Sequence, residues 1–133
     1  FFLNTVGSQL SVNKLNDAVQ HLETKFDIEI PEYTLCANRI GDDFYHCWYL
    51  GTKAKIDEAQ LAKALDEFLQ NANKNYKVAR SKALEGVKVS KVCPSVFYDW
   101  SGSNKKKGGQ VKMERVMGEE RFAEWEEFVQ NSN

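Results

Sequence analysis

The chain has 133 residues, of which 42% are hydrophobic and 12% aromatic, and its formal net charge is -1. A chain of this length forms one domain, and this composition excludes a disordered or fibrous protein. No apolar run approaches the roughly 18 residues of a membrane span, and no signal-like leader opens the chain, so we expect a cytoplasmic protein without membrane contact. Its three cysteines have neither a CxxC spacing nor a neighbouring histidine pair, which argues against a disulfide framework and a metal site.

The first 50 residues predict a strand, a helix and a β-hairpin. A short apolar strand over 1–5 is followed by a break at 7–9. Apolar residues then recur every three or four positions over 11–27, which predicts an amphipathic helix with its first residue, a serine, as the N-cap. Two runs rich in β-branched and aromatic residues, 28–40 and 44–50, flank a Gly-Asp turn and predict a hairpin.

The second half of the chain predicts five further elements. Asp57, with a glutamine three residues later, resembles a capping box at the start of a second amphipathic helix. A helical turn or two over 75–84 leads to a strand over 87–92, where valines alternate, and a short helix is expected over 94–100. The final helix is expected from Glu119, with acidic residues at its positive N-terminal end.

This order, β-α-β-β-α-β with extra helices, indicates an α+β, ferredoxin-like fold over a single domain, 1–133. We expect a mainly antiparallel sheet with helices packed on one face, plus an extra C-terminal helix. The fold hosts many functions, so it does not by itself indicate one.

The segment 105–115, KKKGGQVKMER, has the most distinctive charge in the chain. It carries five basic residues and one glutamate, so the rest of the chain has a net charge of -5, and 116–133 alone contains five glutamates. Its two glycines let the backbone bend close to a ligand, and a lysine on such a loop can bring a positive charge to a carboxylate or phosphate. The alternative is that all four lysines are solvated loop residues without a ligand.

Other side chains offer little catalytic chemistry. His21 and His46 are far apart in the sequence and have no obvious nucleophile partner, so surface or structural roles are favoured. The predicted hairpin would place Cys36 opposite Cys47, as buried thiols or, alternatively, as a disulfide.

The segment 108–115, GGQVKMER, resembles the Q-x-K-x-P-R signature of the acyl-acid amido synthetases of the auxin-responsive promoter family, which are relatives of the acyl-CoA ligases. Two further segments occur in the family's order, 73–80 (NKNYKVAR) and 95–100 (SVFYDW). The opening, 1–12, is similar to the segment that leads into the small C-terminal domain of these enzymes, and it starts without methionine, as a fragment would. The resemblance therefore covers almost the whole chain.

The resemblance implies an ATP- and Mg²⁺-dependent ligase that activates a carboxylic acid as an acyl-adenylate and transfers it to an amino acid or other amine. The chain would be the small C-terminal lid, with an N-terminal ATP-binding domain as its partner; alone it would be monomeric, inactive and without a cofactor. By position in the motif, Lys112 would be the catalytic residue, and Gln110 and Arg115 would contact substrate, nucleotide or the partner domain. The family has proline where this chain has Glu114, which places a carboxylate two residues from Lys112.

Two other function classes fit parts of the pattern. The first is a ferredoxin-like RNA-binding module that uses the hairpin aromatics Phe44, Tyr45, Trp48 and Tyr49 together with the lysine run. The acidic Asp42-Asp43 at the strand start and a pI near 6.2 argue against nucleic-acid binding. The second is a small-molecule regulatory domain of the same fold, which would dimerise through its sheet.

Overall fold

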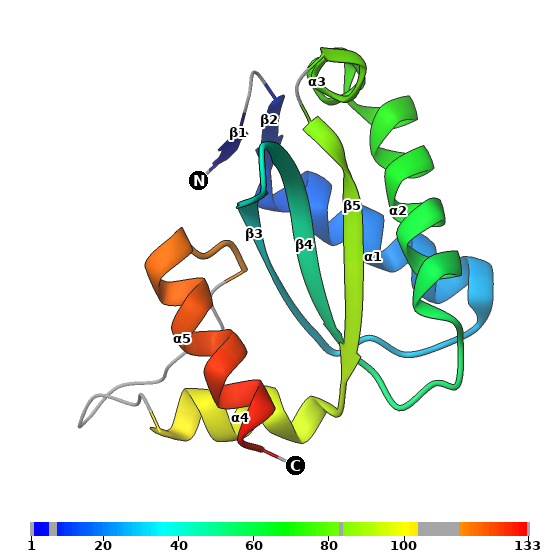
Figure 1. Ribbon diagram of the computed structural model, residues 1–133. Coiled ribbons are helices and arrows are strands. Elements are labelled where there is room, and N and C mark those ends of the chain that lie inside the picture. Colours follow the sequence, from blue (N-terminus) through cyan, green and yellow to red (C-terminus); the bar gives the residue numbers. More distant parts are fainter. Residues whose placement is uncertain (1, 6–7, 83, 104–114, 133) are drawn as a thin grey trace.

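The computed structural model describes residues 2–5, 8–82, 84–103 and 115–132 of the chain. These residues form strands and helices in separate layers, and the α+β class expected from the sequence is confirmed (Figure 1). In chain order the elements are β1 (Phe2–Thr5), β2 (Ser8–Ser11), α1 (Val12–Phe26), β3 (Glu32–Ile40), β4 (Asp43–Gly51), α2 (Glu58–Ala72), α3 (Lys74–Lys82), β5 (Leu84–Val92), α4 (Pro94–Ser103) and α5 (Glu119–Gln130).

The helices α1 and α2 begin at the side chains that the sequence indicated. Ser11 Oγ accepts a hydrogen bond from the backbone N–H of Lys14 at 3.2 Å, and Asp57 Oδ1 accepts one from Ala59 at 3.0 Å. α1 ends at Asp27, whose left-handed φ of 54° terminates the helix. Both predicted caps are therefore confirmed, because a cap needs only partners two or three residues away.

β3 and β4 form the predicted antiparallel hairpin, with Cys36 directly opposite Cys47. Gly41 makes the turn at a φ of 65°, a left-handed conformation that glycine adopts without steric cost. β3 begins at Glu32, later than expected, since Pro31 has no N–H to donate to a strand ladder. Both cysteines are buried and free, so the expectation of buried thiols is confirmed and the alternative disulfide is absent.

The three-stranded sheet has the order β3-β4-β5 and is mixed, whereas the sequence suggested a mainly antiparallel sheet. β4 pairs antiparallel with β3 and parallel with β5. The connection explains the difference, because α2 and α3 carry the chain back along the sheet before β5 begins, and such a crossover joins parallel strands. In a split βαβ unit another strand separates the two parallel ones; here β4 and β5 pair directly.

The N-terminal strand β1 pairs with β2 in a separate hairpin, and this pair is not hydrogen-bonded to the three-stranded sheet. The register of the hairpin joins Phe2 to Ser11 and Thr5 to Ser8. The expected break at 7–9 is therefore wrong at its last two residues, which lie in β2. Their polar side chains give no strand pattern in the sequence, so pairing with β1 decides their conformation.

Helices cover both faces of the three-stranded sheet, whereas the sequence suggested one face. Figure 1 shows α1 and α2 on one side of the sheet and α4 and α5 on the other. Trp48 and Leu35 pack into the core under α1 and α2, and Cys36 and Tyr49 pack into the core under α4 and α5. Successive residues of a strand point to opposite faces, so the almost continuous apolar run of β4 supplies both cores.

Candidate functional site

Of the three candidate site residues, Arg115 lies among the described residues. Lys112 and Gln110, like Glu114, fall in 104–114, outside the described residues, and their roles stay predictions. The described chain stops at Ser103, the last residue of α4, and resumes at Arg115. The contacts of Arg115 therefore define how the end of the basic segment is attached to the fold.

The backbone that follows the basic segment is bonded to the outer edge of β3. The Leu35 N–H donates to the Arg115 carbonyl at 2.9 Å, and the Met117 N–H donates to the Leu35 carbonyl at 2.9 Å. Val116 thereby forms a parallel bridge with Leu35. Thr34 Oγ1 also donates to the Arg115 carbonyl, at 3.4 Å. This short stretch extends the sheet by one bridge and fixes the backbone position of Arg115.

The side chain of Arg115 is held by the start of β3. Its Nη1 donates to Glu32 Oε1 at 2.8 Å and to the Tyr33 carbonyl at 3.0 Å, and its guanidinium lies 4.5 Å from the centre of the Tyr33 ring. The Arg115 and Glu32 side chains are 30% and 20% exposed, so solvent screens this ion pair less than it screens a fully exposed pair. Sequence reasoning missed Glu32, because the two residues are 83 positions apart and no local pattern relates them.

Tyr33 supports Arg115 from the side of the core. Its ring stacks on Trp48 at 5.6 Å, and its hydroxyl donates to Asn16 Oδ1 on α1. Burial raises the pKa of Tyr33 to about 12, against a smaller opposing effect of the Arg115 charge. The hydroxyl therefore stays a neutral hydrogen-bond donor at neutral pH. The Arg115 guanidinium packs on the Tyr33 ring, which is part of the core, so a movement of this ring would disturb the core packing.

Two residues of the segment NKNYKVAR form a second polar cluster around Asp66. Arg80 donates to this carboxylate through Nε at 2.7 Å and Nη2 at 3.1 Å, and the Tyr76 hydroxyl donates to it at 2.6 Å. Arg80 Nη1 also donates to the carbonyls of Leu84 and Glu85. Burial raises the pKa of Asp66, but the hydrogen bonds from Arg80 and Tyr76 outweigh it and hold that pKa below its ordinary value. The cluster ties α2, α3 and β5 together and has a structural role.

The histidines have structural surroundings in the described part of the chain. His21 stacks on Phe68 at 4.8 Å, between α1 and α2. His46 is completely buried with its ring 5.6 Å from that of Tyr76, and neither ring nitrogen has a hydrogen-bond partner among the described residues. Burial lowers the pKa of His46 to about 4, while the charge of Asp66 acts in the opposite direction. A buried neutral imidazole of this kind is a packing group rather than a proton carrier at neutral pH.

The hairpin aromatics lie in the two cores. Trp48 is buried and Phe44 packs against the core under α1 and α2, whereas Tyr45 and Tyr49 pack against the core under α4 and α5. An RNA-binding sheet needs aromatic rings on an open face where bases can stack. Helices cover both faces here, which argues against this use of the sheet.

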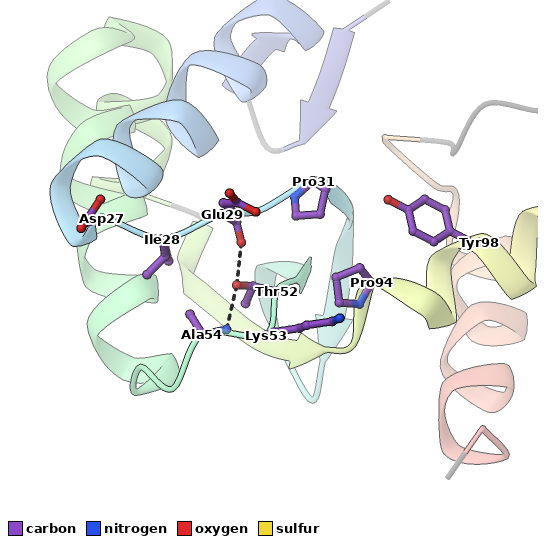
Figure 2. A pocket seen from close by; sticks show the side chains of 9 residues that line it. All are labelled: Asp27, Ile28, Glu29, Pro31, Thr52, Lys53, Ala54, Pro94 and Tyr98. Atoms are coloured by element: carbon purple, nitrogen blue, oxygen red, sulfur yellow. Dashed lines mark hydrogen bonds between the residues drawn. The ribbon is translucent and has the colours of Figure 1, made fainter.

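A groove of about 520 Å³ lies between the α1–β3 loop, the β4–α2 loop and the start of α4 (Figure 2). Thr52 Oγ1 bridges two of these loop segments, because it donates to the Glu29 carbonyl at 2.7 Å and accepts from the Ala54 N–H at 3.1 Å. Asp27 and Tyr98 lie at opposite ends of the groove in Figure 2. The lining residues are Asp27, Ile28, Glu29, Pro31, Thr52, Lys53, Ala54, Pro94 and Tyr98. Arg115 is not among them, so its cluster and the groove are separate features.

Within the described ranges, no group of three or more His, Cys, Asp or Glu side chains is placed to hold a metal ion. None of the helices in those ranges combines the length and the apolar character that crossing a bilayer requires.

Comparison with known proteins places this arrangement in a family. The family model described as the GH3 family C-terminal domain matches residues 13–121. The fold is shared with the solved structure of GH3.15 acyl acid amido synthetase, at a TM-score of 0.78 and 12% identity, and with that of AtGH3.15 acyl acid amido synthetase in complex with 2,4-DB, at 0.71 and 17%. No curated protein sequence matches the chain.

Both structural alignments cover 98% of this chain and 25% of the other chain, so the chain spans a quarter of the length of these relatives. At these identities the structural matches establish the fold alone. The family match extends over most of the chain, and it includes 73–80, 95–100 and 108–115, three of the four segments on which the sequence resemblance rests. The chain therefore belongs to the GH3 family and corresponds to its C-terminal domain.

Proposed function

We propose that the chain is the C-terminal lid of an ATP-dependent acid-amine ligase. The observation that carries the proposal is the family match over residues 13–121, which spans the basic segment. The shared fold with an acyl acid amido synthetase supports it, since that enzyme's name describes the same class of reaction. A relative is described in complex with 2,4-DB, which supports an enzyme that binds a ligand.

In the proposed reaction, a carboxylate oxygen of the acid attacks the α-phosphorus of ATP, the bond to the β-phosphate oxygen breaks, and pyrophosphate leaves. An amine nitrogen, from an amino acid or another amine, then attacks the acyl carbon of the adenylate. AMP leaves with the electrons of the acyl C–O bond, and the nitrogen loses a proton. Lys112 stabilises the negative charge that develops between the carboxylate and the α-phosphate in the first step, as a point charge rather than a nucleophile.

The proposal assigns ATP, Mg²⁺ and the substrate pockets to an N-terminal domain. The described residues offer no cluster for a metal ion, and the sequence lacks the glycine-rich GxxxxGK[ST] and GxGxxG motifs that bind phosphates. The relatives are about four times as long as this chain, which leaves room for such a domain. On this division of labour the chain alone is inactive, and its lysine acts when the two domains close.

Replacing Lys112 by alanine in the full-length protein tests the proposal. We expect Lys112→Ala to slow acyl-adenylate formation by about 100-fold or more, because a preorganised charge at the reacting atoms is lost. ATP–pyrophosphate exchange that depends on the acid measures this step.

Lys106→Ala is the matched control, because it removes the same charge from the same segment. It should leave the exchange rate nearly unchanged. Normal exchange in Lys112→Ala would overturn the proposed role of that lysine.

A further inference from the structure

Arg115 is attached to the fold twice, once through its backbone and once through its side chain. Its carbonyl accepts from the Leu35 N–H at 2.9 Å, while its Nη1 donates to Glu32 Oε1 at 2.8 Å and to the Tyr33 carbonyl at 3.0 Å. The guanidinium carbon also lies over the ring of Tyr33, 4.5 Å from its centre. A residue fixed at both ends in this way cannot shift along the edge of β3 without breaking several contacts.

We propose that Arg115, clamped by Glu32 and Tyr33, is a positioning residue for the adenylation step. It fixes the point at which the basic segment joins the sheet, three residues after Lys112. The inference rests on the proposed function of Lys112. Misplacement of a reacting group by about 1 Å can cost up to about 100-fold in rate, so the fixed end of this segment matters for catalysis.

The contacts of Arg115 favour positioning over direct contact with a ligand. Its Nη1 is shared between a carboxylate and a backbone carbonyl, both supplied by β3. Turning the guanidinium toward a substrate would leave the Glu32 carboxylate, which is only 20% exposed, without this partner. Leaving one member of a shielded ion pair unpaired is costly. Nη1 of Arg115 is thus engaged within the fold.

The chain provides a matched ion pair for comparison. Arg80 and Asp66 are 2.7 Å apart, with side chains 24% and 16% exposed, close to the values for Arg115 and Glu32. Arg80 also donates to two backbone carbonyls, so it is embedded in the fold to a similar degree. Its partners among the described residues lie in α2 and β5, however, whereas those of Arg115 lie in β3. The two ion pairs therefore differ mainly in the elements that they connect.

The experiment compares Arg115→Gln, Glu32→Gln and Arg80→Gln in the full-length protein. Acid-dependent ATP–pyrophosphate exchange gives kcat and KM for the acid and ATP, and thermal unfolding gives the midpoint of each variant. We expect Arg115→Gln and Glu32→Gln to lower kcat roughly 10- to 100-fold while KM changes by less than about twofold. Arg80→Gln should lower the midpoint to a similar extent without that loss of kcat. Arg115→Lys should recover part of kcat, because it keeps the charge opposite Glu32.

Two results would overturn the inference. One is a loss of kcat in Arg115→Gln no larger than in Arg80→Gln; the other is a raised KM for ATP at unchanged kcat, which would make Arg115 a nucleotide contact. If Arg115→Gln fails to fold, Glu32→Gln decides the question by the same criteria. Lys112→Ala separates the two proposals: normal exchange there defeats the proposed function, whereas lost exchange there with normal exchange in the Arg115 variants defeats the positioning role alone.

Discussion

His46 lies in β4 with its imidazole completely buried, and burial lowers its pKa from 6.5 to about 4. The ring faces Tyr76, and the charges of Asp66 and Arg80 act on it in opposite directions. The unfolded chain takes up this proton near pH 6.5 and the folded chain only near pH 4, so the unfolded state binds more protons in between. The contribution of His46 to the free energy of unfolding is therefore fully present above about pH 6.5, and it falls as the pH drops toward 4.

Acid should destabilise the fold in part through His46. Between about pH 7 and about pH 4.5 we expect His46 to lower the free energy of unfolding by roughly 2 to 3 kcal/mol. His46→Leu should make the pH dependence in this window flatter, whatever its effect at neutral pH. Urea unfolding at both pH values measures the difference. Equal pH dependence in wild type and His46→Leu would refute the assignment.

At the scale of elements, the end of β4 meets the start of α4 at a glycine. A Cβ atom on Gly51 would lie 2.8 Å from Phe97 Cε1 and 3.2 Å from the Glu32 carbonyl oxygen. Phe97 is itself buried, so it has little room to yield. This close approach lets α4 pack on the sheet directly after β5.

Adding one methyl group at this contact should loosen it. We expect Gly51→Ala to lower the free energy of unfolding by about 1 to 3 kcal/mol, the usual range for overpacking. Gly86→Ala is the control within a neighbouring strand, since its Cβ would come no closer than 3.9 Å to Tyr45. Urea unfolding of the two variants checks the contrast, and equal losses would show that the clash at Phe97 is relieved without cost.

At the scale of the whole molecule, the two cores on either side of the sheet are built by different parts of the chain. The core under α4 and α5 centres on Trp125, which is completely buried 4.8 Å from Phe97 and 5.7 Å from Tyr49. Cys36 and Cys47 belong to this core, and burial raises the pKa of their thiols to about 12 and about 11. The reactivity of these two thiols therefore measures how stably α5 covers this face of the sheet.

A thiol reagent at neutral pH should label the exposed Cys93 rapidly and leave Cys36 and Cys47 unlabelled. Trp125→Ala should make both buried thiols reactive, because such truncations cost about 3 to 5 kcal/mol and open this core. Leu69→Ala, in the opposite core, is the control. Mass spectrometry of labelled peptides reads out each site. Equal labelling in the two variants at equal global stability would mean that the thiols react only through complete unfolding.

The sequence by itself determined the structural features that depend on residues close together in the chain. The caps at Ser11 and Asp57 and the turn at Gly41 follow from residues within four positions, and the helix periods and the hairpin follow from local apolar spacing. The order of short motifs also indicated the family, since motif order survives where overall identity is low. These features were predicted correctly because each is decided by a short stretch of chain.

Only the tertiary structure decided how the elements meet. The chain has 19 acidic residues, and nothing local selects Glu32 as the partner of Arg115 or Asp66 as that of Arg80. The parallel pairing of β4 with β5, and the placement of α4 and α5 on the second face, likewise depend on where all the other elements pack. Contacts between distant residues form only when the whole core brings them together, so a local pattern cannot specify them.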